Sequence, residues 1–244
     1  MNSVFEPLLA ALSGPVDERF HRGKDYRAEA DQLRDVFLKE GSVSSVLNLG
    51  CGTGRHLELL AAAGYDVVGV ERSPELASRA RVRLAGFPSR AAVVEADLFE
   101  LTMDRTFDAV IMMFAMLGHQ VTNHRVRSTL DALRRQVGHG GLVVFDVLDA
   151  AQVLASPPVN GVLSFTSGDR EVLIAHTTVV NVAAQVIELC LRTWELPGGG
   201  PVEQTYTIRY FAQRELALVL QVAGLELVGS APLAASRLVW ARRI

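Results

Sequence analysis

The chain has 244 residues, with 24 lysines and arginines against 27 aspartates and glutamates, and 49% of its residues are hydrophobic. This length and apolar content suit one large domain with a sizeable core and exclude disorder as the general state. The formal net charge of −3 argues against a nucleic-acid partner, because such proteins usually present a basic face to many phosphates.

Cysteines are too few for a disulfide framework, since the sequence has only Cys51 and Cys190. The six histidines are scattered, and a closed metal site needs three or four convergent ligands, so we expect no metal. The apolar run 8–12 is too short for a signal peptide, and polar residues interrupt the late apolar stretch 216–239. We therefore expect a cytoplasmic protein with no membrane partner, and a homodimer stays open.

Helices and short apolar strands alternate along the first 150 residues. Ser73 and Pro74 are typical of a helix start, and Gly41 is typical of a helix end. The expected strands cover 44–49, 66–71, 91–95, 107–114 and 142–148, and the expected helices cover 25–40, 55–63, 74–84 and 126–137. The glycine-rich stretch 138–141 is predicted to be a turn. This alternation indicates a doubly wound α/β fold with a parallel sheet covered on both faces.

The pattern changes near residue 150. Residues 162–210 predict three or four longer strands with turns at 167–169, near Asn181 and at 197–201. The partial alternation of 185–191 is typical of a half-exposed antiparallel strand. A helix over 212–223 and two closing strands, 225–228 and 236–241, are expected to follow.

A glycine turn joins the first predicted strand to a helix in the run Leu47-Asn48-Leu49-Gly50-Cys51-Gly52-Thr53-Gly54. A turn bare of Cβ atoms lets backbone amides approach a ligand closely. Glu71 ends the next strand, 21 residues after Gly50, where a carboxylate can accept hydrogen bonds from both hydroxyls of a ribose. Glycine turn, strand context and acidic residue together predict a nucleoside site.

The spacing of the glycines excludes the dinucleotide pattern G-x-G-x-x-G, because Arg55 and Leu57 stand where its third glycine would fall. The sequence also contains no G-x-x-x-x-G-K-[ST]. The glycine turn is therefore not expected to bind a phosphate group. A nicotinamide oxidoreductase is disfavoured for the same reason.

Several motifs, in this order and spacing, resemble those of class I S-adenosylmethionine-dependent methyltransferases: 47–54, Glu71, Ala96-Asp97-Leu98 and Phe107-Asp108-Ala109-Val110. The runs 22–26 and 113–119 look more narrowly like the deoxyaminosugar N-methyltransferases of antibiotic biosynthesis. The resemblance covers about residues 20–150. It implies a seven-stranded, mostly parallel sheet with an antiparallel excursion over the active site. We expect one domain, with 25–150 as the cofactor-binding core and 151–210 as an inserted segment on the substrate side.

The resemblance also implies which residues bind S-adenosylmethionine. Gly50, Gly52 and Gly54 would face its methionine and ribose portions, and Glu71 would hold the ribose. The other implied contacts are Asp97 and the Leu98 amide with adenine, Tyr26 and the Met113 carbonyl with the methionine tail, and Cys51 and Arg72 beside the turn. Cys51 has no base partner assigned, so a small turn-filling residue is favoured over a nucleophile.

His119 follows the fourth strand, at the sheet edge where open α/β folds bind ligands. We expect it to contact substrate and to act as a general base, and a surface role stays open. Trp194, Tyr206, Arg209 and Arg237 are further candidates for the acceptor pocket, with packing as the alternative.

The expected reaction is methyl transfer to nitrogen or oxygen of a small molecule, such as a sugar or natural-product intermediate. It needs alignment more than covalent help from the protein. We expect residues 1–24 and 150–210 to close over the pocket. The alternatives left open are transfer to carbon, transfer to a peptide or protein, and a non-catalytic protein that only binds the cofactor.

Overall fold

The computed structural model describes residues 24–167, 169–233 and 236–244. Residues 1–24, which are expected to close over the pocket, lie outside these ranges except for Lys24.

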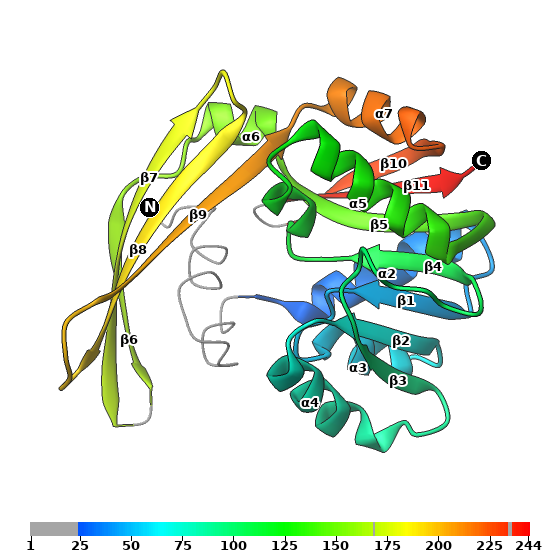
Figure 1. The fold of residues 1–244 in the computed structure, drawn as a ribbon, viewed down its shortest axis with the longest axis horizontal. Coiled ribbons are helices and arrows are strands. Elements are labelled where there is room, and N and C mark those ends of the chain that lie inside the picture. The colour runs from blue at the N-terminus through cyan, green and yellow to red at the C-terminus, as the bar shows by residue number, and fades with distance from the viewer. Residues whose placement is uncertain (1–23, 168, 234–235) are drawn as a thin grey trace.

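Seven strands form the core sheet in the order β3-β2-β1-β4-β5-β11-β10 (Figure 1). The first five strands run parallel, whereas β11 is antiparallel to both β5 and β10. The strands are β1 Ser45–Leu49, β2 Asp66–Glu71, β3 Ala91–Glu95, β4 Phe107–Met112, β5 Val137–Asp149, β10 Leu225–Leu233 and β11 Ser236–Arg243. The predicted α/β fold with a mostly parallel sheet is confirmed.

Helices cover both faces of this sheet, as expected of strands that are apolar on both sides. One core cluster contains residues of α2 (Tyr26–Glu40), α3 (Arg55–Ala62) and α4 (Pro74–Arg83). The other contains residues of α5 (Asn123–Gln136) and α7 (Gln213–Val222). Ser73 caps α4 by accepting a hydrogen bond from the Leu76 amide at 3.4 Å, which matches its predicted role. The short 3-10 turn η2 (Leu84–Gly86) follows α4.

The expected turn at 138–141 is wrong, because these residues lie within β5. Phe107 pairs with Val137 and Ala109 pairs with Leu142, so that Asp108 alone lies opposite all four residues of the stretch. Gly140 adopts a φ of 77° there, which glycine tolerates. The glycines therefore form a bulge in the strand.

Four antiparallel strands make a second sheet at the end of β5, as Figure 1 shows. They are β6 Gly161–Ser167, β7 Arg170–Asn181, β8 Val186–Leu196 and β9 Val202–Phe211, with the predicted turns between them. We call them the acceptor sheet, after the substrate-side role that the sequence predicts for residues 151–210. β5 joins it through two residue pairs, Leu148 with Tyr210 and Asp149 with Phe211. The helix α6 (Ala150–Ala155), which the sequence did not predict, lies between the two sheets in the chain.

None of the described helices is long and apolar enough to span a membrane.

Candidate active site

The glycine turn lies where β1 ends, at the carboxyl edge of the parallel strands. Gly50, Gly52 and Gly54 have φ values of 71°, 56° and 80°, a region that glycine adopts easily. The amides of Gly50 and Cys51 both donate to the Val70 carbonyl, at 2.8 and 3.0 Å. A Cβ at Gly52 would meet nothing within 4 Å, whereas one at Gly54 would lie 3.2 Å from Ala80 Cβ. Gly52 thus borders open space, and Gly54 lets α3 pack closely on α4.

Glu71, at the end of β2, lies beside this turn. Its Oε2 accepts from the Gly52 amide at 3.0 Å, and its Oε1 accepts from the Ser73 amide at 2.9 Å. The side chain is buried. Each carboxylate oxygen can accept more than one hydrogen bond, so a fixed and buried acceptor stands next to the open space at Gly52.

Asp97 and Leu98 follow β3, and both are half-buried. Asp97 Oδ1 accepts from the Phe99 amide at 2.8 Å, and the preceding Ala96 amide donates to the Glu71 carbonyl at 3.2 Å. The loop after β3 is therefore hydrogen-bonded to the end of β2. Arg72 is exposed.

Cys51 is buried in the glycine turn, and its burial raises the pKa of the thiol to about 12. The sulfur therefore stays a neutral thiol near pH 7, and a neutral thiol is a poor nucleophile. A turn-filling role stays the prediction for Cys51.

The loop after β4 approaches the same turn. Met113 is buried, Phe114 and Ala115 have positive φ values, and the 3-10 turn η3 (Met116–His119) follows. The Met116 thioether lies against Gly50, so a Cβ there would overlap it. His119 ends η3, where it keeps access to solvent. The protein around the imidazole still excludes part of its water, and this desolvation lowers its pKa below the ordinary value of histidine.

Tyr26 begins α2 and belongs to a buried polar cluster. Its ring meets His56 edge-on, with centroids 5.0 Å apart. Glu29 binds His56 at 2.7 Å and Lys24 at 2.6 Å. Burial raises the pKa of Tyr26, and the charge of Glu29 raises it further, so the phenol remains neutral.

The buried Glu29 remains ionised despite its surroundings. Burial alone would raise its pKa, but hydrogen bonds and the positive charge of its partners outweigh burial and lower it. Local sequence patterns did not indicate Lys24, Glu29 and His56 as a group, because the contact between Glu29 and His56 joins residues 27 positions apart. The sequence signal that could have indicated this ion pair is the placement of Lys24 and Glu29 on either side of the predicted helix start.

Comparison with known proteins shows what this region is similar to. Residues 46–141 match the family model described as a methyltransferase domain. Residues 46–141 are therefore similar to a methyltransferase domain, and the methyltransferase domain below means these residues. The matched residues contain the glycine turn, Glu71, Asp97 and the loop after β4.

Two curated relatives and one solved structure illustrate the similarity. The chain is 33% identical over 126 residues to the dTDP-3-amino-3,4,6-trideoxy-alpha-D-glucopyranose N,N-dimethyltransferase of Streptomyces venezuelae, covering 51% of this chain and 52% of the relative. It is 31% identical over 143 residues to the dTDP-3-amino-3,6-dideoxy-alpha-D-glucopyranose N,N-dimethyltransferase of Streptomyces fradiae, covering 56% and 54%. The match thus spans about half the length of each curated relative.

The sugar N-methyltransferase KedS8 from Streptoalloteichus sp. shares the fold over nearly the whole chain. The TM-score is 0.78, with 24% identity, and the match covers 96% of this chain and 94% of that one. The likeness therefore extends beyond the methyltransferase domain and includes the acceptor sheet.

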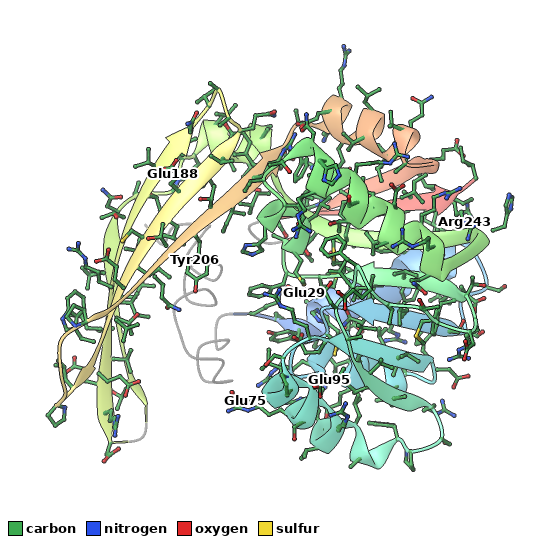
Figure 2. All side chains as sticks on the ribbon, viewed as in Figure 1. Glu29, Glu75, Glu95, Glu188, Tyr206 and Arg243 are labelled. Carbon is green, nitrogen blue, oxygen red and sulfur yellow. The ribbon has the colours of Figure 1, made fainter. Side chains whose placement is uncertain are left out.

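Within the acceptor sheet, Trp194 and Tyr206 lie on opposite faces. Tyr206 pairs with Leu189, whereas Trp194 lies five residues further along β8 and pairs with Leu173. Side chains alternate along a strand, so an odd separation reverses the face. The face with Tyr206 packs against Ala115 of the methyltransferase domain, and Figure 2 shows Tyr206 on the side of β9 toward that domain. The expectation that both aromatic residues line one pocket is wrong, and Trp194 lies on the far face.

The two arginines expected near the acceptor are held by carboxylates. Arg209 is buried and pairs with Glu215 at 2.6 Å. Arg237 donates to Asp149 at 2.5 Å, at the junction of β5 with the acceptor sheet. Both guanidinium groups therefore fix the structure around the junction.

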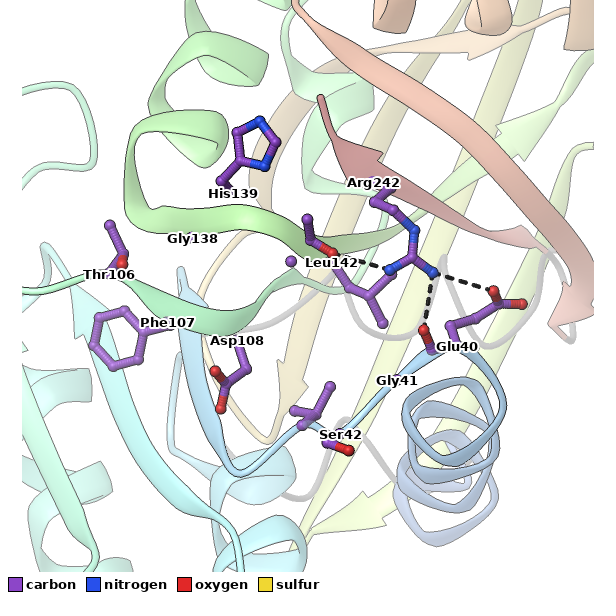
Figure 3. Close-up of a pocket in the computed structure, with 13 residues that line it drawn as sticks. Glu40, Gly41, Ser42, Thr106, Phe107, Asp108, Gly138, His139, Leu142 and Arg242 are labelled. Carbon is purple, nitrogen blue, oxygen red and sulfur yellow. Dashed lines mark hydrogen bonds and ion pairs between the residues drawn. The ribbon is translucent and has the colours of Figure 1, made fainter.

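A polar pocket of about 230 Å³ lies at the opposite, amino edge of the core strands (Figure 3). Arg242 binds the Gly140 carbonyl and the Glu40 carbonyl there, both at 2.9 Å. Asp108 accepts from both amides and both hydroxyls of Ser44 and Ser45. These groups are satisfied within the protein, and the glycine turn is at the other edge, so the pocket is not the candidate active site.

Proposed function

We propose that this protein transfers a methyl group from S-adenosylmethionine to a nitrogen or oxygen atom of a small acceptor, such as an aminosugar or another natural-product intermediate. The observation that carries the proposal is the Glu71 carboxylate, held beside the open space at Gly52. Both curated relatives described above are named as N,N-dimethyltransferases of amino sugars, which favours nitrogen as the acceptor atom.

The residues at the carboxyl edge fit this cofactor. A side chain at Gly52 would enter open space, so the bare turn leaves room for a nucleoside. Glu71 would accept from the ribose hydroxyls, and Asp97 with the Leu98 amide would bind adenine. Bound S-adenosylmethionine supplies a methyl carbon activated by a positive sulfur.

The tail of the cofactor would lie near the start of α2. Tyr26, neutral because burial raises its pKa, would donate a hydrogen bond to the methionine carboxylate. The Met113 carbonyl would accept from the ammonium group. Gly50, Gly54, Cys51 and Arg72 complete the proposed cofactor site.

The protein's main contribution to the rate would be alignment, because orientation of two reactants alone can supply roughly 7–11 kcal/mol. His119 would take the proton that an amine or hydroxyl acceptor loses. Its lowered pKa keeps the imidazole neutral and able to accept that proton at neutral pH. Tyr206 would contact the acceptor from the other side, while Arg209 and Arg237 would support the pocket through their carboxylate partners.

We further propose that residues 25–150 act as the cofactor-binding core and that 151–210 act as the substrate-side segment of one domain. The break between the two groups of strands near Asp149 supports this division. A cytoplasmic location would fit an enzyme of small-molecule biosynthesis.

Mass spectrometry of reactions with S-adenosylmethionine and a panel of amino sugars, other amines, alcohols and peptides tests the function. We expect a gain of one or two methylene units on a small amine, with S-adenosylhomocysteine formed in step. Methylation of carbon or of peptides alone would favour the alternatives named above. Cofactor binding without turnover across the panel would favour a non-catalytic protein, and tight NADH binding in a fluorescence titration would contradict the proposed cofactor.

A further inference from the structure

The loop after β4 contains an unusual backbone conformation. Phe114 and Ala115 are consecutive residues with φ values of 79° and 50°. Residues with a Cβ rarely adopt this left-handed region, because the Cβ crowds the backbone. Such a turn persists only where its surroundings impose it.

Asp146, near the end of β5, supplies one such contact. Its Oδ1 accepts from the Ala115 amide at 3.0 Å, and its Oδ2 accepts from the Ser236 hydroxyl at 2.9 Å. Asp146 and Ala115 are 3% and 2% exposed. Water therefore cannot replace the carboxylate as the acceptor of this amide, and the loss of Asp146 would leave a buried donor unpaired.

Phe114 has a separate restraint from the start of α2. The Lys24 ammonium lies 4.3 Å from the centre of the Phe114 ring, and Glu29 holds this ammonium at 2.6 Å. The turn is thus fixed at Ala115 by a carboxylate and at Phe114 by a cation.

The conformation of this turn determines the positions of the residues on either side of it. Met113 directly precedes it, and the Ala115 carbonyl accepts from the Gly118 amide at 2.8 Å, which starts η3. η3 then places Met116 against Gly50 and packs Gly118 on β9, where a Cβ would lie 2.8 Å from the Arg209 carbonyl oxygen.

We propose that Asp146 is a positioning residue for methyl transfer: its carboxylate holds the left-handed turn at Phe114 and Ala115, and this turn orients Met113 toward the cofactor and His119 toward the acceptor. The inference rests on the function proposed above. Asp146 acts on the main chain of the turn and not on the reacting atoms. Because the side-chain oxygen of asparagine can also accept a hydrogen bond from the Ala115 amide, asparagine at position 146 should still hold the turn.

The test compares Asp146→Ala with Asp146→Asn in the full-length chain. Hydrogen exchange of the peptide 113–119 and calorimetric binding of S-adenosylhomocysteine are the two measurements. We expect Asp146→Ala to exchange at least tenfold faster in this peptide and to bind at least tenfold more weakly. Asp146→Asn should stay within threefold of the unmodified chain in both. Once an acceptor is identified, the alanine variant should lower kcat by a larger factor than it raises the KM for that acceptor.

Asp108→Ala is the matched control, because Asp108 also accepts backbone hydrogen bonds, from the Ser44 and Ser45 amides at 3.0 and 2.9 Å, but at the opposite edge of the sheet. It should lower the melting temperature but leave exchange in 113–119 and S-adenosylhomocysteine affinity within twofold. Equal losses in the Asp108 and Asp146 variants would overturn the proposal, as would an asparagine variant that behaves like alanine or an alanine variant without effect.

If Asp146→Ala does not fold, Asp146→Val takes its place, since valine suits a strand and offers no acceptor. If neither variant folds but Asp146→Asn does, Asp146 is needed for folding itself, and the positioning role is overturned. If the unmodified chain binds no S-adenosylhomocysteine, the proposed function fails. Hydrogen exchange then still decides whether Asp146 holds the turn.

Discussion

The thioether of Met116 lies against the α-carbon of Gly50, so the glycine turn after β1 and the loop after β4 form one continuous surface. The two segments are 66 residues apart in the chain. Contact between them means that a change in one alters the binding surface of the other.

Gly50→Ala should weaken the binding of S-adenosylhomocysteine. The new methyl group would overlap Met116, and the φ of 71° costs an L-residue about 1–2 kcal/mol. We expect at least about a tenfold rise in Kd by calorimetry. The double variant Gly50→Ala/Met116→Ala should recover part of the affinity. Gly41→Ala is the control and should not change the affinity, because a Cβ at Gly41 meets nothing within 4 Å. Unchanged binding in Gly50→Ala would contradict the close contact.

Glu71→Gln tests the proposed ribose contact. The amide keeps one acceptor oxygen but loses the charge, and hydrogen bonds to charged groups contribute about 1.5–3 kcal/mol. Affinity for S-adenosylhomocysteine should therefore fall by roughly 10- to 100-fold. Glu95→Gln is the control, since Glu95 pairs with Glu71 in register on β3 but is exposed. Equal affinities for the Glu71 and Glu95 variants would argue against ribose binding.

The activity should depend on pH through His119. Desolvation lowers the pKa of this side chain below the ordinary value of histidine, so it is neutral and accepts protons at neutral pH. The value of kcat/KM should therefore hold down to about pH 6.5 and fall only at lower pH, where the imidazole becomes protonated. His119→Asn and His119→Ala should lose this acidic limb and turn over more slowly. If both variants keep full kcat/KM from about pH 6 to 9, His119 is not the base.

Tyr206→Ala and Trp194→Ala form a matched pair on the acceptor sheet. Tyr206 lies on the face that packs against the methyltransferase domain, and Trp194 lies on the other face. The tyrosine variant should raise the acceptor KM by roughly fivefold, which corresponds to ~1 kcal/mol of lost contact. The tryptophan variant should keep its KM. The reverse result would place the acceptor on the far face.

Local patterns predicted most of the core. Ser73 and Pro74 marked the start of α4, and the apolar runs before Gly50 and Glu71 marked β1 and β2. These signals are readable because a cap or a buried strand is determined by neighbouring residues. The stretch 138–141 has the composition of a turn, and only its pairing opposite Asp108 makes these glycines a bulge within β5.

The site was predicted less completely than the fold. The positions of Glu71 and the glycine turn follow from one strand–turn–helix–strand unit, residues 45–71, which a single stretch of sequence specifies. Trp194 and Tyr206 could not be assigned to faces without the register of β8 and β9, and a one-residue slip reverses a face. The ion pairs of Arg209 and Arg237 join different elements, so no local pattern reveals them.

The chain leaves the core at Asp149 and re-enters it at Phe211, and these two residues are direct neighbours across β5 and β9. An inserted segment whose ends adjoin can be lengthened, shortened or exchanged without pulling its host apart. The residues proposed for the nucleoside precede this junction, while Tyr206 lies inside the insertion. On the division of roles proposed above, a different insertion grafted at the same two points would redirect the protein to new acceptors while retaining its methyl donor.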